Sequence, residues 1–334
     1  GHEPILPCIM TLLLFMLPTV VPISIVAFIV IQLPVGDYSD VLINQRLAMG
    51  EDVDRAEIDR IIDRYGLDQP IHVQYWRWVS GIITRGDFGE SFMMEQPVGN
   101  LIWSRIAFTF VLSFSTTIFI WIVAIPIGIF SALKQYSLGD YVATTIGFLG
   151  LAIPNFLLAL IFMWISFSVF GQSVGGLFSP EFVDAAWSIP KFLDLLSHLW
   201  IPVIVLGTAG TASLIRQMRA NLLDELRKPY VATARSKGLR ERTVIWRYPV
   251  RIAMNFFVSA QANILVNLIS GATIVSVVLS LPTSGSLLLR ALTAQDMYLA
   301  GTFILLLSTL NVISTLLSDI ALAILDPRIR YTKS

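Results

Sequence analysis

Six long apolar stretches restrict the folds open to this chain more strongly than any other feature of its sequence. They are residues 8–33, 106–133, 141–170, 195–215, 252–281 and 298–325, and each reaches the roughly 20 residues that a helix needs to cross a bilayer. Because hydrocarbon offers no water to backbone polar groups, a single segment that crosses it forms a helix. The sequence therefore predicts an all-α integral membrane protein with six transmembrane helices.

The composition agrees with a membrane protein and argues against several other classes. Of the 334 residues, 55% are hydrophobic and 14% are charged, whereas soluble domains carry about 25% charged residues. The formal net charge is zero, so no basic excess points to a nucleic acid. The sequence has one cysteine, Cys8, and no cluster of cysteine and histidine that suggests a metal site. We expect this chain to bind no metal or other cofactor itself.

Charge is unevenly distributed between the apolar stretches. Residues 216–251 hold ten Lys or Arg and three acids, whereas residues 33–103 hold 12 acids and six Arg. Basic residues near the ends of membrane spans resist translocation, so the loop 216–251 is predicted to be cytoplasmic. Alternation along six helices then places both termini in the cytoplasm and the acidic segment outside the cell membrane.

The acidic segment 34–105 is predicted to form a small helical extracytoplasmic subdomain. Residues 53–65 place apolar side chains on one side of a helix. Residues 70–83 carry Tyr75, Trp76 and Trp78, and such aromatic residues suit a helix at the membrane interface. The chain thus divides into a first transmembrane helix (1–33), this subdomain (34–105) and a core of five transmembrane helices (106–334).

The basic loop contains a short patterned stretch. The helical spacing of leucines that leads into it stops at Pro229, and residues 231–234 can restart a short helix that Gly238 ends. A short helix on the inner face of a membrane protein is well suited to docking into a groove of a soluble partner. The alternative is a solvated basic loop that touches lipid headgroups.

Three asparagines fall in the fifth apolar stretch: Asn255, Asn263 and Asn267. Asn263 and Asn267 are four residues apart and so share one face of a helix. They either line a translocation path or form hydrogen bonds between packed helices, which is at least as common for asparagine in membranes.

Asp319 is the one charged residue well inside an apolar stretch, about two turns from the inner end of the sixth. A lone carboxylate in a span is costly, so we expect it to have a partner such as Arg216, Arg219 or Arg251. Its position near the cytoplasmic end favours a structural clasp between the sixth helix and the basic loop over a contact with substrate.

The sequence shows no sign that this chain is an enzyme or an ion-driven carrier. It lacks the His-Glu-x-x-His motif of metalloproteases and the Gly-Lys-Ser/Thr of a phosphate-binding loop, so it is predicted not to hydrolyse ATP itself. Ion-driven carriers tend to show buried carboxylates or broken helices in repeated halves, and neither is evident. If the chain takes part in active transport, a partner must supply the energy.

Four ordered motifs carry a resemblance to a known family. The stretch 230–239, Tyr-Val-Ala-Thr-Ala-Arg-Ser-Lys-Gly-Leu, resembles the cytoplasmic coupling segment, or EAA loop, of bacterial ABC importer permeases. Residues 65–70 and the Gly-Asp-Phe-Gly-Glu-Ser of 86–91 resemble the external segment of B-type subunits for dipeptides, oligopeptides and nickel. The Asp-Pro-Arg-Ile-Arg of 326–330 is similar to that family's ending, and Gln-Leu-Pro at 32–34 also fits.

This resemblance implies a type I ABC importer permease in the bacterial inner membrane. Such a chain pairs with a C-type permease subunit, two ABC ATPase subunits that use ATP and Mg, and an extracytoplasmic substrate-binding protein. The implied contacts with the ATPase are Tyr230, Ala232, Thr233, Ala234, Arg235, Lys237 and Gly238. In the broader loop pattern a Glu stands where this chain has Ala232, so no acidic contact is carried over. Arg290 and Asp296 are the candidates for contact with the binding protein.

The resemblance leaves the transported solute open. Oligopeptides are the leading prediction, and oligosaccharides, opine-type conjugates and nickel are the alternatives within the same importer class. A secondary carrier or channel, and an intramembrane enzyme or scaffold, are the alternatives from other classes. The ligand of the associated binding protein would discriminate between the solutes.

Overall fold

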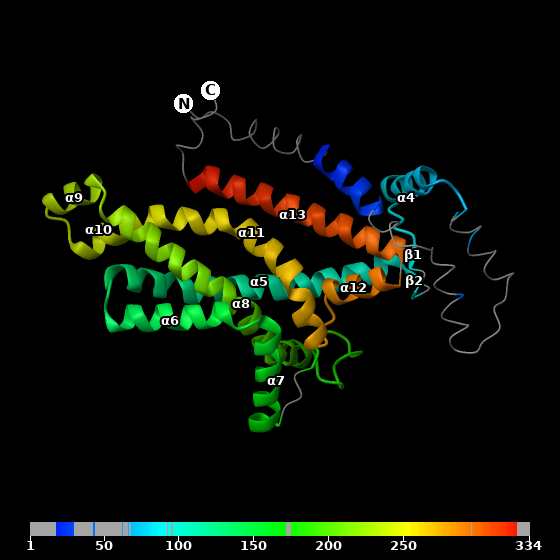
Figure 1. Ribbon diagram of the computed structural model, residues 1–334, viewed down its shortest axis with the longest axis horizontal. Helices are drawn as coiled ribbons and strands as arrows, with labels where there is room; N and C mark the ends of the chain where they lie inside the picture. Colours follow the sequence, from blue (N-terminus) through cyan, green and yellow to red (C-terminus); the bar gives the residue numbers. More distant parts are fainter. Residues whose placement is uncertain are drawn as a thin grey trace. The chain divides into compact units, whose positions relative to one another are not determined.

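The computed structural model describes residues 18–29, 43, 62, 66, 68–91, 93, 94, 96–171, 175–294 and 296–325. Within these ranges the protein is helical apart from one two-stranded antiparallel hairpin, in which Glu90 pairs with Pro97 and Ser91 with Gln96 (Figure 1). A helix covers Pro18–Ile29. The labelled elements are α4 (Ile71–Arg85), β1 (Glu90–Ser91), β2 (Gln96–Pro97), α5 (Val98–Leu133), α6 (Leu138–Ala152), α7 (Asn155–Phe170), α8 (Ile189–Leu226), α9 (Pro229–Ser236), α10 (Glu241–Arg247), α11 (Pro249–Val278), α12 (Ser284–Thr293) and α13 (Met297–Leu325).

Several of these helices have the length and apolarity that a membrane span requires. Among the described residues, α5, α8 and the first 21 residues of α13 qualify, and α6 with α7 makes a fourth if the bent pair is one span. The 30-residue helix α11 covers most of the fifth predicted stretch. An all-α membrane fold is therefore confirmed in its coarse form, whereas the count of six spans stays a prediction.

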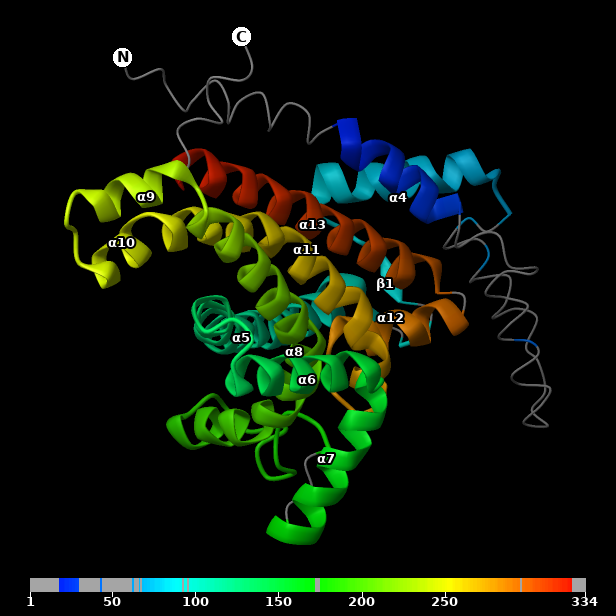
Figure 2. The ribbon, with the colours of Figure 1, turned by 60° about the vertical axis from the view of Figure 1, so that its left-hand side comes forward.

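The predicted helix 141–170 is wrong as a single continuous element. The structure breaks it into α6 and α7, whose axes differ by 101° (Figures 1 and 2). Proline disfavours the helical conformation in the residue before it, and Ile153, which precedes Pro154, has φ −86° and ψ 122°. The pyrrolidine ring thus ends α6 and starts α7, so these are two helices and not one kinked helix.

The chain divides into two compact units, of which the first contains residues Gly1–Phe108 and Thr283–Val312. Its apolar core includes Phe28, Trp78 and Phe303, each buried. The Phe28 and Trp78 rings stack with centroids 5.7 Å apart, and the Ser24 hydroxyl lies 2.8 Å from that of Tyr75. The predicted helix at 70–83 is α4. Its Trp78 packs inward, while Trp76 is 69% exposed.

The predicted amphipathic helix 53–65 lies outside the described residues apart from Ile62. The rest of segment 34–105 that the structure describes consists of residues 43, 66 and 68–70, α4, the 86–90 turn, the hairpin and the start of α5.

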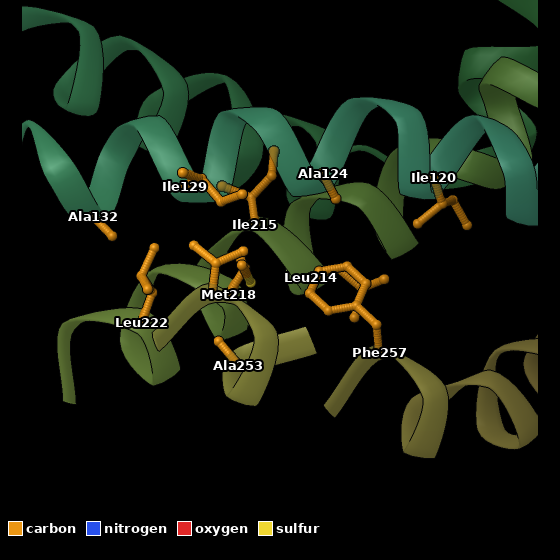
Figure 3. Close-up of a cluster of buried hydrophobic side chains, with 11 residues drawn as sticks. Ile120, Ala124, Ile129, Ala132, Leu214, Ile215, Met218, Leu222, Ala253 and Phe257 are labelled. Atoms are coloured by element: carbon orange, nitrogen blue, oxygen red, sulfur yellow. The ribbon is translucent and has the colours of Figure 1, made fainter. Parts of the chain in front are cut away.

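The second unit contains residues Thr109–Pro282 and Ile313–Ser334. Its core lies where α5, α8 and α11 pack, as Figure 3 shows for side chains such as Ile120, Met218 and Phe257. Lipid tails are as apolar as these side chains, so close van der Waals packing rather than transfer from water holds membrane helices together. At Gly128 a Cβ would come within 2.6 Å of the Met218 Cβ, so this glycine lets α5 approach α8 closely.

Candidate functional site

The cytoplasmic segment predicted from the sequence forms a compact helical projection between α8 and α11. Helix α8 continues to Leu226, 11 residues beyond the predicted span, and is followed by α9 and α10 before α11 begins at Pro249. Both views place α9 and α10 beyond the paired ends of α8 and α11 (Figures 1 and 2). Proline occupies the first position of α9 and of α11, where its missing N–H costs no helical hydrogen bond.

A small apolar core holds α9 against α10. Val231, Ala234 and Val244 are buried in it, and the rings of Tyr230 and Tyr248 pack at its edge with centroids 6.5 Å apart. Ala234 is only 6% exposed. Its methyl group packs against the chain's own α10, and its contact with a partner stays a prediction.

Tyr230 also faces inward and joins α9 to the end of α8. Its hydroxyl donates a short hydrogen bond to the Glu225 carboxylate. Burial, together with the hydrogen bond and the negative charge of Glu225, raises the pKa of Tyr230 above its ordinary value. The phenol thus stays neutral and remains a donor, so Tyr230 holds α9 in place rather than presenting a surface to a partner.

The outer face of α9 is small and exposed. Ala232 and Thr233 lie on it, and Lys237 and Gly238 follow at its end, all four exposed. The Thr233 hydroxyl donates to the Pro229 carbonyl at 3.0 Å, so it projects little from the helix. Gly238 has φ +72°, a left-handed conformation that glycine adopts without strain, and it ends the helix where the chain reverses.

Arg235 is exposed but engaged within the chain. Its guanidinium forms a bidentate pair with Glu241 of α10, with Nη2 to Oε1 at 2.6 Å. This hydrogen bond from Arg235 lowers the pKa of Glu241, and that to Glu241 raises the pKa of Arg235. Exposed pairs of this kind contribute about 0–1 kcal/mol. Arg235 therefore has a partner already, which a docking protein would have to displace.

The structure reveals an ion pair at the base of this projection that the sequence did not predict. The carboxylate of Asp140, a residue that is 2% exposed, accepts two hydrogen bonds from Arg219, each 2.9 Å long, and one from the Tyr136 backbone N–H. Asp140 lies in the first turn of α6, three residues after the capping Ser137. That spacing predicts a local capping role, and nothing in the sequence points to an arginine 79 residues away.

The structure describes the side chain of only one of the four polar residues that were singled out in the predicted spans, Asn255, Asn263, Asn267 and Asp319. Asn255 is half-buried on α11. Asn263 and Asn267 belong to the same helix and Asp319 to α13, but their side chains lie outside the description. Arg219, one of the partners predicted for Asp319, pairs with Asp140.

Asp296 is buried, which does not fit its predicted contact with a binding protein. One of its carboxylate oxygens accepts from the Ser91 hydroxyl at 2.6 Å and from the Met93 N–H at 3.1 Å. The other accepts from the Leu299 N–H at 3.1 Å, at the start of α13. The side chain is 0% exposed, so it ties the hairpin to α13. Arg290 on α12 is exposed and remains a candidate for the predicted contact.

Within the described residues, no group of histidine, cysteine and carboxylate side chains could hold a metal ion. Ser188 and Lys191 have the spacing of a serine–lysine catalytic pair, but they do not form one. The Lys191 ammonium donates to the carbonyls of Val183 and Ala185, at 3.2 and 2.5 Å, and lies over two aromatic rings. Ser188 caps the start of α8 by accepting from the Lys191 backbone N–H.

Comparison with known proteins matches the chain over most of its length. Residues 124–331 match the family described as binding-protein-dependent transport system inner membrane component. Residues 9–113 match the N-terminal family of the same transport-system membrane components. Together the two regions contain the projection, the Asp140–Arg219 pair and segment 34–105.

Curated relatives match over nearly their full lengths. The chain is 32% identical over 320 residues to the oligopeptide transport system permease protein AppB of Bacillus subtilis (strain 168), covering 95% of this chain and 97% of that protein. It is 29% identical over 333 residues to the dipeptide transport system permease protein DppB of Alkalihalophilus pseudofirmus, covering 96% and 98%. It is 30% identical over 319 residues to the glutathione transport system permease protein GsiC of Salmonella paratyphi A, covering 96% and 97%. The chain therefore belongs to the family of binding-protein-dependent transport system inner membrane components.

Proposed function

We propose that this chain is the B-type permease subunit of an ATP-driven ABC importer for short peptides. The observation that carries the proposal is a match over nearly the whole chain to permeases named for oligopeptides, dipeptides and glutathione. All three solutes are short peptides or peptide-like. They favour this substrate class over the oligosaccharides, opine-type conjugates and nickel that the sequence left open, and over a secondary carrier or channel.

Helix α9 is the proposed contact with an ATPase subunit. Its outer face is small, so another protein's groove can approach its backbone closely. Its inner face is fixed to α10 by Val231, Ala234 and Val244, and its start is fixed to α8 through Tyr230. A displacement of α9 would therefore move α8 and α11 with it, because α9 and α10 would shift together without changing their contact. Ala232, Thr233, Lys237 and Gly238 are the surface positions of this contact. Tyr230 and Ala234 support it from within, and Arg235 supports it through its exposed ion pair with Glu241.

The rest of the assembly is proposed from the family. This chain pairs with a C-type permease, and the two together bind two ATPase subunits, which use ATP and Mg, and receive solute from an extracytoplasmic binding protein. The chain crosses the membrane six times. The first transmembrane helix ends at residue 33, the extracytoplasmic subdomain ends at residue 105, and both termini lie in the cytoplasm. Asn255, Asn263 and Asn267 remain candidates for the translocation path, and Asp319 for a clasp near its inner end.

Topology is testable with single cysteines at exposed positions. After Cys8→Ser removes the native thiol, Thr84→Cys on α4 should react with an impermeant thiol reagent added to intact spheroplasts. Ser236→Cys on α9 should react only after the membrane is permeabilised. Both side chains are exposed in the structure, so access from one side of the membrane decides the result. Labelling of Ser236→Cys in intact spheroplasts would show that the orientation is the reverse of the proposed one, so α9 could not contact the ATPase.

The solute is testable in cells that lack this chain. We expect uptake of a radiolabelled tripeptide to fall to background and to return when the chain is restored, while uptake of a free amino acid is unchanged. The complex purified through a tag on this chain should contain a second permease and ATPase subunits. The binding protein that stimulates it should carry a peptide when analysed by mass spectrometry, and a sugar, an opine or nickel in its place would contradict the proposal.

A further inference from the structure

Helices α6 and α8 pack against each other as an antiparallel pair, and a cavity of about 240 Å³ lies along the line where they meet. At one end of the pair Arg219 binds Asp140. At the other end a Cβ on Gly150 would lie 2.6 Å from the Thr208 methyl group, so the two helices approach closely there. Ligand cavities in proteins usually have volumes of about 300–1,000 Å³, so this one can hold only part of a molecule.

Most of the cavity wall is apolar. Helix α8 contributes Ala212 and Ile215, and α6 contributes one face of its helix between Ala143 and Leu151. These eight steps along α6 span about 12 Å of its axis, close to the roughly 15 Å of hydrocarbon in one leaflet of a bilayer. Phe148 and Leu151 are exposed at the edge of the cavity. The wall therefore forms a groove that fits one extended apolar chain.

Positive charge gathers at one end of this groove. Arg216 lies one turn before Arg219 on α8, so it is at the end where Arg219 binds Asp140. Arg216 is exposed, and it makes no hydrogen bond or ion pair with another residue that the structure describes. Asp140 neutralises Arg219, and the described lining of the groove contains no acid. The groove thus keeps one positive charge, beside the exposed hydroxyl of Thr144.

The charged end of the groove also carries two tyrosines. Tyr136 precedes α6 and Tyr141 lies in its first turn, and both are exposed. Tyrosine is enriched at the level of the lipid headgroups. In the proposed orientation Arg216 begins the cytoplasmic segment, and the cytoplasmic leaflet carries anionic lipids. The charged end of the groove then lies at the headgroups of that leaflet, and the apolar part lies in its hydrocarbon.

From this arrangement we infer that the groove between α6 and α8 binds one anionic phospholipid of the cytoplasmic leaflet. Arg216 and Thr144 bind the phosphate, and one acyl chain lies along α6 as far as Leu151. An anionic headgroup is favoured over a zwitterionic one because no acid in the described lining is free to bind an ammonium group. A protein surface laid over Arg216 would desolvate its charge at a cost unless it supplied an acid. The inference goes beyond the proposed function and rests on it only for the orientation of the chain.

The test uses the complete importer complex in phosphatidylethanolamine nanodiscs that contain a trace of a lipid probe with a photoreactive diazirine in its acyl chain. One probe has a phosphatidylglycerol headgroup and the other a phosphatidylethanolamine headgroup. Mass spectrometry then measures attachment to residues 143–151 and to α7, which is apolar and has no charged residue. Attachment to 143–151 should favour the phosphatidylglycerol probe at least about fivefold, the factor that matches the contribution of one basic residue near anionic lipid. Attachment to α7 should favour neither probe.

A pair of variants separates the groove from the general charge of the cytoplasmic side. Arg216→Gln should reduce the headgroup preference at 143–151 to the level seen at α7. Arg247→Gln removes an exposed arginine of α10 that does not line the groove, so it should retain the full preference. Both complexes should contain the same subunits as the wild type.

Several results would overturn the inference. They are equal attachment of the two probes at 143–151, and a preference for phosphatidylglycerol that survives in Arg216→Gln. Attachment to α7 without attachment to 143–151 would show that another subunit covers the groove. Loss of the second permease from the Arg216→Gln complex would likewise make the groove a subunit interface. Peptide uptake by wild-type cells is independent of these outcomes, so failure of the inference and failure of the proposed function are distinguishable.

Discussion

Asp140→Ala should lower the free energy of unfolding of the permease by about 2–3 kcal/mol. Removing one partner of a fully buried ion pair typically costs about 3–5 kcal/mol, because the other charge stays desolvated. The cost is smaller here since the Arg219 side chain is 27% exposed and can reach water. Arg219→Ala should cost more than Asp140→Ala, because the Asp140 side chain is only 3% exposed and would be left charged and buried.

The measurement is denaturant unfolding of the complex in nanodiscs, with both single variants and the double variant. If the two side chains act as a pair, the double variant should be more stable than the sum of the single effects implies, by about 1–3 kcal/mol. Asp184→Ala, which removes an exposed acid, is the matched control and should change stability little. Strictly additive effects of Asp140→Ala and Arg219→Ala would show that the pair does not hold α6 to α8.

Reversing the two charges should not restore stability. The Asp140 carboxylate also accepts from the Tyr136 N–H at 2.9 Å, and a guanidinium at that position has no acceptor to offer. Asp140→Asn keeps an acceptor for that N–H and loses the charge, so its stability should fall between those of wild type and Asp140→Ala.

Helices and their faces could be predicted from the sequence because their signals are local. The sixth apolar stretch was expected to begin at Tyr298, and α13 begins at Met297. The short helix after Pro229 and its end near Gly238 were also predicted, since both depend on residues with strong backbone preferences. The break at Ile153 was missed even though it is local. Proline is tolerated inside membrane helices when neighbouring groups satisfy the backbone, but at Pro154 the restriction that proline places on the residue before it ends the helix.

The contacts that define the site could not be predicted in the same way. Ser91 and Asp296 are separated by 205 residues and Asp140 and Arg219 by 79, and helical periodicity says nothing about such pairings. Ala234 shows a related limit, because a small residue in a basic loop suits a partner's groove and the chain's own α10 equally well. The sequence pattern identified the helix, whereas only the packing of α9 on α10 shows which of its faces is free.

Because only one face of α9 is free, a bulky residue on that face should affect coupling to the ATPase without affecting stability. Ala232→Trp adds a bulky ring to the exposed face, so it should leave unfolding unchanged but block close approach of the ATPase. Overpacking a close contact costs about 1–3 kcal/mol, which corresponds to a loss of at least roughly fivefold in affinity. Peptide import into proteoliposomes should fall by at least that factor, with fewer ATPase subunits retained in the purified complex.

Ala234→Trp makes the same change on the buried face and provides the comparison. Because Ala234 is 6% exposed against α10, this variant should lose both stability and import. Lys134→Trp, at an exposed position in the turn between α5 and α6, should lose neither. A complex with Ala232→Trp that imports peptide and retains its ATPase subunits as the wild type does would exclude the outer face of α9 as the coupling surface, and stability loss in that variant would show that Ala232 is a packing residue instead.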